Sequence, residues 1–321
     1  MIKIKIVDTN PKVFIIILNW NGKDLTIECL NSLKGIEYDN YQVVVVDNGS
    51  TDDSTTVIKE QFPHLLLLEN GANLGFSAGN NVGIEYAIAH GADYIFLLNN
   101  DTIVDPQVIS ALMEASTKYP DAGIFGSKIY YYGSSEKIWY AGAQWFPDKL
   151  RFEHIGQGKI DNGKDWQDIR ETDYICGCAL LIKADVIKQI GMLEPKYFLM
   201  WEESDLCYRA RRSGYKSIVV PSSKVWHKIS ASFSGGDKAP HYQYFWWRNR
   251  LLWIERNIPF SESFKLYPLI ARDIFRQVRN YLSPQTTSQD RLRSKAALQG
   301  VQDYFLRSFG DCPSWVRSHI K

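Results

Sequence analysis

Two neighbouring acidic residues in an aromatic setting are candidates for proton transfer. Glu202 and Glu203 follow the aromatic run 197–201 and begin a predicted helix that extends to about residue 213. A carboxylate whose pKa is tuned by its neighbours can serve as a general base, and the ring of Trp201 could stack on a sugar. Because the helix dipole also favours acidic residues at a helix start, a purely structural role stays open.

A third carboxylate, Asp47, ends the buried run 43–46. In that position it could accept a hydrogen bond from a nucleobase or a ribose hydroxyl. Capping of the next helix is the alternative, but Ser50 or Asp52 would serve equally well as the cap. Asp47 is therefore expected to be spare for binding.

The segment Asn99-Asn100-Asp101 follows another apolar run. A hard divalent cation that bridges a diphosphate needs only one or two carboxylates from the protein, and Asp101 could be one of them. Asn99 could hold a ribose hydroxyl. A simple turn is the alternative, since Asn and Asp favour turns.

His227 lies in the segment Val-Trp-His-Lys, 225–228. A neutral imidazole is a fitting second ligand for a manganese-like ion, although a lone histidine is more often structural.

An alternation of apolar runs and helical patterns predicts the elements that position these side chains. The runs lie at 13–18, 43–46, 65–68 and 94–98, and the helices at about 24–33, 53–62, 75–90 and from 105 onward. Such strand–helix units predict an α/β fold with a mostly parallel twisted sheet and helices on both faces. The polar clusters 19–21, 47–52 and 99–101 should then share the rim at the carboxyl ends of the strands.

The rest of the chain is less regular. From about 124 to 172 the pattern loosens, which indicates an acceptor-facing insertion or lid with short strands. A regular stretch follows at 174–182, with a helix at 184–190 and a short strand at 217–220.

Composition and missing motifs exclude several classes. Lys plus Arg number 37 and Asp plus Glu 36 in 321 residues, so the chain lacks the basic footprint of a nucleic-acid-binding protein. The longest apolar run near the start has six residues, whereas a membrane helix needs about twenty. Neither a phosphate-binding P-loop nor a standard dinucleotide fingerprint is present.

Taken together, the motifs resemble those of inverting glycosyltransferases of family two, which have the GT-A fold, and most of all their bacterial rhamnosyltransferase-like branch. The matching stretches occur in the family's order across about residues 12–255. They are Ile-Leu-Asn-Trp-Asn-Gly (17–22), Val-Val-Asp-Asn-Gly-Ser-Thr-Asp (45–52), Asn-Leu-Gly-Phe-Ser-Ala-Gly-Asn-Asn-Val-Gly (73–83), Leu-Leu-Asn-Asn-Asp-Thr (97–102), Phe-Leu-Met-Trp-Glu-Glu-Ser-Asp-Leu-Cys-Tyr-Arg (198–209), Val-Trp-His-Lys (225–228) and Tyr-Phe-Trp-Trp-Arg-Asn (244–249).

The resemblance implies a domain plan. Residues 1–240 would form the GT-A catalytic domain, with a nucleotide-sugar half at about 1–123 and an acceptor-facing half at about 124–240. Residues 241–321 would form a helical C-terminal appendage.

The resemblance also implies roles for individual residues. The nucleotide-sugar pocket would be formed by Asn19, Trp20, Asp47, Asn73, Gly75, Asn80, Asn99, Asn100 and Trp201. Asp101 and His227 would bind Mn²⁺ or Mg²⁺, with Asn99 in the first position of the family's Asp-x-Asp motif. Glu203 would be the general base; the family usually has Asp there, which leaves Glu202 as the alternative.

The implied activity is the metal-dependent, inverting transfer of a sugar, with rhamnose as the leading candidate. The donor would be a dTDP- or UDP-linked sugar and the acceptor a glycan or polyprenyl-linked glycan in cell-surface polysaccharide and cell-wall synthesis. Two alternatives are a metal-dependent sugar nucleotidyltransferase and a non-catalytic sugar-nucleotide-binding protein.

The appendage carries a marked positive charge. Ten basic and four acidic residues between 248 and 295 leave a local charge of +6, interleaved with aromatic residues such as Trp246, Trp247 and Trp253. From 264 to 282 apolar residues recur at helical spacing with arginines between them, as on an interfacial helix. We therefore expect a cytoplasmic protein that contacts the inner face of the plasma membrane peripherally. Packing on the catalytic domain, or a homodimer through this region, is the alternative.

Overall fold

A mixed β-sheet with packed helices forms the body of the protein. The computed structural model describes residues 10–134, 136–228 and 239–317. Its strands are β1 Val13–Asn19, β2 Tyr41–Asp47, β3 Leu66–Glu69, β4 Tyr94–Asn99, β5 Thr102–Val104, β6 Ala122–Tyr131, β7 Ile138–Tyr140, β8 Ala143–Phe146, β9 Arg151–His154, β10 Arg170–Glu171, β11 Ala179–Lys183 and β12 Lys216–His227. The main sheet has the order β10-β12-β6-β11-β4-β1-β2-β3, with β5 beside β12 and β7 beside β6.

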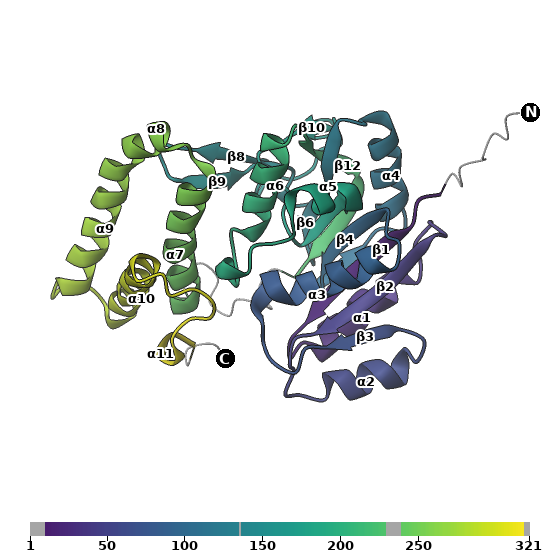
Figure 1. The fold of residues 1–321 in the computed structure, drawn as a ribbon, viewed down its shortest axis with the longest axis horizontal. Helices are drawn as coiled ribbons and strands as arrows, with labels where there is room; N and C mark the ends of the chain where they lie inside the picture. Colours follow the sequence, from purple (N-terminus) through teal and green to yellow (C-terminus); the bar gives the residue numbers. More distant parts are fainter. Residues whose placement is uncertain (1–9, 135, 229–238, 318–321) are drawn as a thin grey trace, which may run out of the picture.

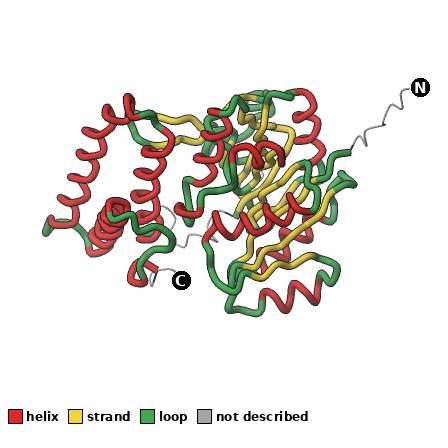
Figure 2. The backbone as a smooth tube through the Cα atoms, viewed as in Figure 1, coloured by secondary structure: helices red, strands yellow, loops and turns green. Residues whose placement is uncertain are grey.

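Helices cover this sheet and form one end of the molecule (Figures 1 and 2). They are α1 Lys23–Leu33, α2 Ser54–Gln61, α3 Gly75–Ala89, α4 Val108–Lys118, α5 Ala184–Ile190, the 3-10 helix η1 Pro195–Tyr197, α6 Glu202–Arg212, α7 Pro240–Asn257, α8 Phe260–Ser263, the 3-10 helix η3 Phe264–Leu266, α9 Tyr267–Leu282, α10 Ser288–Phe305 and α11 Ser314–Arg317. Within the described ranges, no helix combines the length and the apolarity that a membrane span requires.

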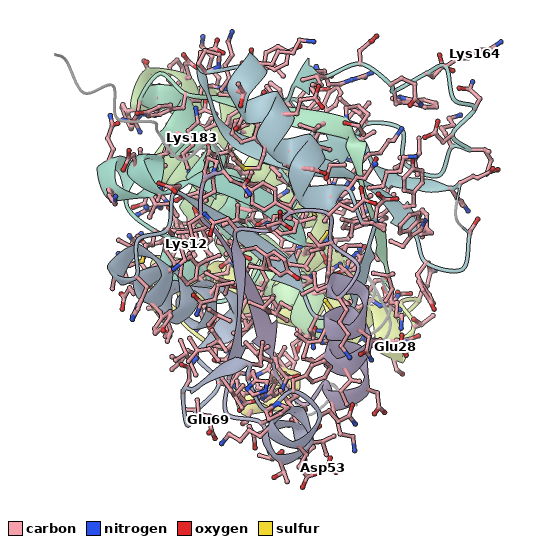
Figure 3. The ribbon with its side chains drawn as sticks, turned by 90° about the vertical axis from the view of Figure 1, so that its right-hand side faces the viewer. Lys12, Glu28, Asp53, Glu69, Lys164 and Lys183 are labelled. Atoms are coloured by element: carbon pink, nitrogen blue, oxygen red, sulfur yellow. The ribbon has the colours of Figure 1, made fainter. Side chains whose placement is uncertain are left out.

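The four parallel strands that the apolar runs predict are confirmed. β3, β2, β1 and β4 are parallel neighbours, and their register places Asn19 beside Asp47 and Leu18 beside Asn99. The strands therefore end at one rim, as expected. Glu69 ends β3, and Asp53 lies in the loop that follows β2. Both lie toward the bottom of Figure 3, whereas Lys12, which precedes β1 at the opposite strand ends, lies higher.

The second half of the sheet corrects two expectations. β6 is a ten-residue strand, so the chain is regular where a loosened pattern was expected to begin. β12 extends over twelve residues to His227, past a register irregularity between Val220 and Lys224, although only 217–220 was expected. Polar residues interrupt the apolar pattern of both strands, which makes them hard to predict from the sequence. Lys128 of β6, for example, is fully buried, and Asp161 pairs with its ammonium group at 2.7 Å.

The C-terminal region is helical, as predicted, but α7 does not face outward. Trp253 and Arg248 are fully buried, and Trp247 and Arg250 are nearly so. Trp253 packs against Trp201, the residue before α6, at a centroid distance of 5.8 Å. The expectation that these four residues contact a membrane is wrong, because α7 packs against the part of the chain before residue 240.

Candidate active site

The ends of β1 and β2 are joined by a hydrogen-bonded pair, Asn19 and Asp47. Asn19 Nδ2 donates to Asp47 Oδ1 at 2.8 Å and to Ser50 Oγ at 3.0 Å, and Asn19 Oδ1 accepts from Thr26 Oγ1 at 2.7 Å. Asp47 also accepts from the Ser50 hydroxyl at 2.6 Å and from the Ser50 N–H at 2.9 Å. Asp47 does not cap α2, but Asn19 and Ser50 fill three of the roughly four acceptor positions of its carboxylate, which leaves about one for a ligand. Asn19 orients Asp47 at the rim instead of offering its own side chain.

The glycine-rich loop before α3 is shaped by an asparagine that sequence reasoning missed. Asn48 Nδ2 donates to Asn73 Oδ1 at 2.9 Å and to the Gly75 carbonyl at 3.1 Å. Asn73 Oδ1 also accepts from the Gly75 N–H at 2.9 Å, and Asn80 Nδ2 donates to the Phe76 carbonyl at 2.9 Å. The amide group of Asn73 therefore fixes the loop, whereas Asn80 bonds back to the first turn of α3. The position of Asn48 directly after Asp47 was the available signal.

Asp101 and His227 are brought together by a strand pairing that the sequence did not reveal. β5 pairs with β12, which sets Thr102 opposite His227. His227 Nε2 lies 3.0 Å from Asp101 Oδ1, and both side chains are buried. Nearby, Asn99 ends β4 half-buried, and Asn100 Nδ2 donates to Thr26 Oγ1 at 3.0 Å.

This pair fits a divalent cation. A carboxylate oxygen and an imidazole nitrogen converge, and the buried Nδ1 of His227 has no hydrogen-bond partner among the described residues. Across those residues there is no cluster of three or more His, Cys, Asp or Glu side chains that could enclose an ion. Two protein ligands leave room for diphosphate oxygens and water, which is how Mg²⁺-like ions are commonly held.

Glu202 and Glu203 begin α6 with strongly perturbed acidity. Burial raises the pKa of Glu203 to about 7, against the opposing effect of its own N–H and that of Gly177. Burial and the neighbouring Glu203 carboxylate raise the pKa of Glu202 well above its ordinary value. In the described part of the chain, one oxygen of each carboxyl group, Oε2, has no hydrogen-bond partner. Both shifts disfavour the charged forms, and Glu203, whose pKa lies near 7, is the carboxyl group that can take up a proton near neutral pH.

The loop that leads into α6 has an unusual backbone. Phe198, Met200 and Trp201 have φ values of 63°, 72° and 79°, a left-handed region that side-chain-bearing residues rarely adopt. Such strain persists only where surrounding contacts enforce it, and it concentrates at functional sites.

Two residues of α7 enforce this backbone. Asn249 Nδ2 donates to the carbonyls of Tyr197, Leu199 and Met200 at 2.8, 2.7 and 3.0 Å. The buried Arg248 donates to the Tyr197 carbonyl at 2.9 Å. We call Arg248 and Asn249 the α7 clamp. Its signal in the sequence was a charged and an amide residue directly after the aromatic run 244–247.

The opposite side of the loop is held by α3. The Phe198 carbonyl accepts from the N–H groups of Phe76 and Ser77 at 2.6 and 3.3 Å, which satisfies the start of that helix. A Cβ at Gly75 would lie 2.5 Å from the Phe198 ring, so only glycine permits this approach. Gly75 thus connects the nucleotide rim to the loop that carries the two glutamates.

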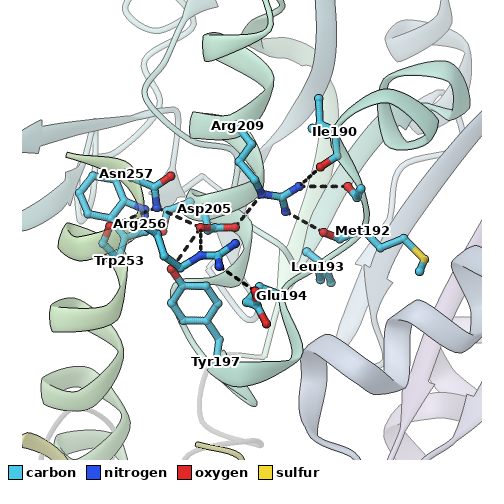
Figure 4. Close-up of polar contacts among 12 residues, drawn as sticks. Ile190, Met192, Leu193, Glu194, Tyr197, Asp205, Arg209, Trp253, Arg256 and Asn257 are labelled. Atoms are coloured by element: carbon cyan, nitrogen blue, oxygen red, sulfur yellow. Dashed lines mark hydrogen bonds and ion pairs between the residues drawn. The ribbon is translucent and has the colours of Figure 1, made fainter. Parts of the chain in front are cut away.

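Asp205 anchors the other side of the α6 start (Figure 4). Its Oδ1 accepts from Arg256 Nε and Asn257 Nδ2, both at 3.0 Å, and its Oδ2 accepts from Arg209 Nε at 2.8 Å. Burial alone would raise the pKa of Asp205, but the two arginines outweigh it and lower the pKa. Asp205 therefore stays ionised and ties α6 to the end of α7.

The two tryptophans assigned to the pocket lie in different environments. Trp20 is 39% exposed beside the rim, whereas only 6% of Trp201 is exposed. The Trp201 ring packs against Trp246 and Phe152 at centroid distances of 5.1 and 5.7 Å. In this structure Trp201 is a packing residue of an aromatic cluster that also contains Trp145, Phe152, Trp246 and Trp253. Its stacking on a sugar stays a prediction.

With this geometry in hand, comparison with known proteins identifies the family. Residues 14–190, more than half of the chain, match glycosyl transferase family 2. The chain belongs to glycosyl transferase family 2.

Similar sequences in this family include rhamnosyltransferases. The chain is 29% identical over 247 residues to N-acetylglucosaminyl-diphospho-decaprenol L-rhamnosyltransferase of Mycobacterium tuberculosis, covering 67% of this chain and 79% of that protein. It is 22% identical over 271 residues to dTDP-rhamnosyl transferase RfbF of Shigella flexneri, covering 77% and 81%.

Solved structures confirm the GT-A fold. GalNAc-T7 with UDP, GalNAc and Mn²⁺ matches with a TM-score of 0.62 and 14% identity, over 98% of this chain and 57% of that one. The mannosyltransferase PcManGT from Pyrobaculum calidifontis with GDP-Man and Mn²⁺ matches with a TM-score of 0.55 and 13% identity, over 93% and 88%.

Proposed function

We propose that this glycosyltransferase moves L-rhamnose from dTDP-rhamnose to a hydroxyl of a lipid-linked glycan, with inversion at the anomeric carbon. The observation that carries the proposal is the buried glutamate pair at the start of α6: each Oε2 lacks a hydrogen-bond partner among the described residues, and burial raises the pKa of Glu203 to about 7. Two relatives are named for rhamnosyl transfer, one of them to a lipid-linked N-acetylglucosamine. The reaction belongs to cell-surface polysaccharide synthesis at the cytoplasmic side of the membrane.

The base is placed to act in a single displacement. Glu203 Oε2 is buried and has no hydrogen-bond partner among the described residues, which supports its pairing with the acceptor hydroxyl once the substrates are bound. As Glu203 takes the proton, the acceptor oxygen attacks the anomeric carbon from the side opposite the nucleoside diphosphate, which leaves. Burial and the Glu203 carboxylate raise the pKa of Glu202, which disfavours a second charge beside the base.

The nucleotide is bound at the rim of the parallel strands. Asp47, oriented by Asn19 and Ser50, accepts from the base or ribose. Asp101 and His227 would hold a divalent cation, which supplies positive charge for the departing diphosphate.

The proposal is tested with donor panels and one binding-site variant. Purified protein should release dTDP from dTDP-rhamnose when a polyprenyl-diphosphate-linked N-acetylglucosamine is present, and Mn²⁺ should raise its melting temperature with dTDP. In Asp101→Asn the metal-dependent part of this rise should disappear. The control is Asp185→Asn, which removes one negative charge from an exposed carboxylate of α5 and should leave the metal-dependent rise unchanged.

Three results would contradict parts of the proposal. Undiminished metal dependence in Asp101→Asn would exclude the ion site. Release of pyrophosphate from a nucleoside triphosphate would indicate a nucleotidyltransferase. Tight dTDP binding without turnover of any donor would indicate a binding protein.

A further inference from the structure

The outer face of α9 is apolar and unusually exposed. Phe275 and Leu282 are each 70% exposed, and Phe264 and Tyr267 about half. Together with Ala271 and the half-buried Val278 they recur every three or four residues, so they form a single stripe that begins at Phe264 in η3 and runs along one side of α9. The opposite side is anchored: Ile270 packs into the aromatic cluster, and Asp273 is buried. Figure 1 shows α9 at the edge of the molecule, away from the sheet.

The charges beside this stripe are positive. Arg272, Arg276 and Arg279 lie on the exposed side of α9. Asp273 is the only acidic residue in the helix sequence, and it points inward, where it pairs with Arg250 at 3.4 Å and with Arg276 at 3.0 Å. One buried acid therefore offsets part of the arginine charge, and the surface remains cationic.

We propose that the outer face of α9 docks on an anionic membrane surface. Exposed aromatic and aliphatic side chains would enter the boundary of the acyl chains, and the flanking arginines would contact anionic headgroups, which is the arrangement of an interfacial helix. A second copy fits this face less well. In a two-fold dimer through α9, the arginines of the two copies would face one another, and no exposed acidic residue of that helix would neutralise their charge. This surface goes beyond the transfer reaction and does not depend on which acceptor is used.

Vesicle binding tests the surface directly. Full-length protein should co-sediment with phosphatidylcholine vesicles that contain phosphatidylglycerol, weakly with phosphatidylcholine alone, and less at high salt. Phe275→Ala should weaken this binding about ten-fold or more, because a buried phenylalanine contributes strongly to transfer out of water. Arg279→Gln should weaken it about five-fold, the effect of one basic residue near an anionic surface.

Matched controls lie elsewhere on the surface. Ile160→Ala removes another exposed apolar side chain, and Arg212→Gln another exposed arginine, so both should bind vesicles like the wild type. Release of dTDP with a soluble acceptor should be unchanged in all four variants, which separates this surface from the transfer reaction.

The proposal is overturned if the wild type ignores anionic vesicles at low salt, or if Phe275→Ala and Arg279→Gln bind as well as the controls. It is also overturned if sedimentation without lipid shows a dimer that Phe275→Ala dissociates, since the face would then belong to a second copy.

Discussion

Burial raises the pKa of both glutamates at the start of α6, and the shift of Glu203 predicts a pH profile. Because the pKa of Glu203 is about 7, the transfer rate should rise as pH increases through 7, when the base loses its proton. Glu203→Gln keeps the shape of the side chain and removes its basicity, so kcat should fall about 100-fold or more. Donor KM should change little.

The control for this prediction is the neighbouring residue. Glu202→Gln should retain most activity, since burial and the Glu203 carboxylate raise the pKa of Glu202 and already disfavour its charged form. If Glu202→Gln is the inactive variant and Glu203→Gln turns over normally, the assignment of the base is off by one residue.

The same residue should make the protein less stable in alkali. The folded-state pKa of Glu203 lies above the ordinary 4.5, so the folded state favours the protonated form. Its ionisation costs nothing below pH 4.5, costs more as pH rises toward 7, and reaches about 3 kcal/mol above that. Glu203→Gln should therefore melt at a higher temperature than the wild type at pH 8, and at a similar temperature at pH 4.5. Equal melting temperatures at pH 8 would show that the carboxylate is not destabilised by burial.

At the scale of helices and strands, the sequence predicts those elements that a local run of apolar residues marks. The apolar runs of β1, β2 and β4 identify a parallel sheet, and the polar residues after them identify its rim. β6 and β12 were harder because contacts distant in sequence stabilise their polar residues, as Asp161 does for Lys128. The strained backbone at Phe198 was not predictable at all, because its hydrogen-bond donors come from α3 and α7.

The α7 clamp makes a prediction at this scale. Asn249→Ala leaves the Leu199 and Met200 carbonyls without this donor, while the Tyr197 carbonyl keeps those from Arg248 and the Leu199 N–H, so the free energy of unfolding should fall by about 2 kcal/mol. Because the freed loop leads to Glu203, kcat should fall and the midpoint of the pH profile should move from about 7, while donor KM stays the same. The exposed Asn31→Ala is the control. A loss of stability with an unchanged pH profile would reduce the clamp to a packing role.

At the scale of the whole molecule, α7 joins the C-terminal helices to the part of the chain before residue 240. Arg256 and Asn257 reach Asp205 of α6, and Trp253 packs into the same aromatic cluster as Trp201. We therefore expect a single cooperative unfolding transition, with coincident curves from tryptophan fluorescence and far-ultraviolet circular dichroism. A chain that ends at Ala239 should lack that transition. Two separate transitions in the full-length protein would instead support an independent appendage after residue 240.

The approach of Phe198 to Gly75 restricts how such enzymes can be recombined. Residues 1–123 would be an attractive module to exchange among relatives that use different donors. A module with any side chain at position 75 would push Phe198 aside, since a Cβ there lies 2.5 Å from its ring. The displacement would move the loop that leads to Glu203. A substitution made to change the donor would therefore lower kcat. Functional chimeras should therefore retain glycine at position 75 or inherit both sides of this contact from one parent.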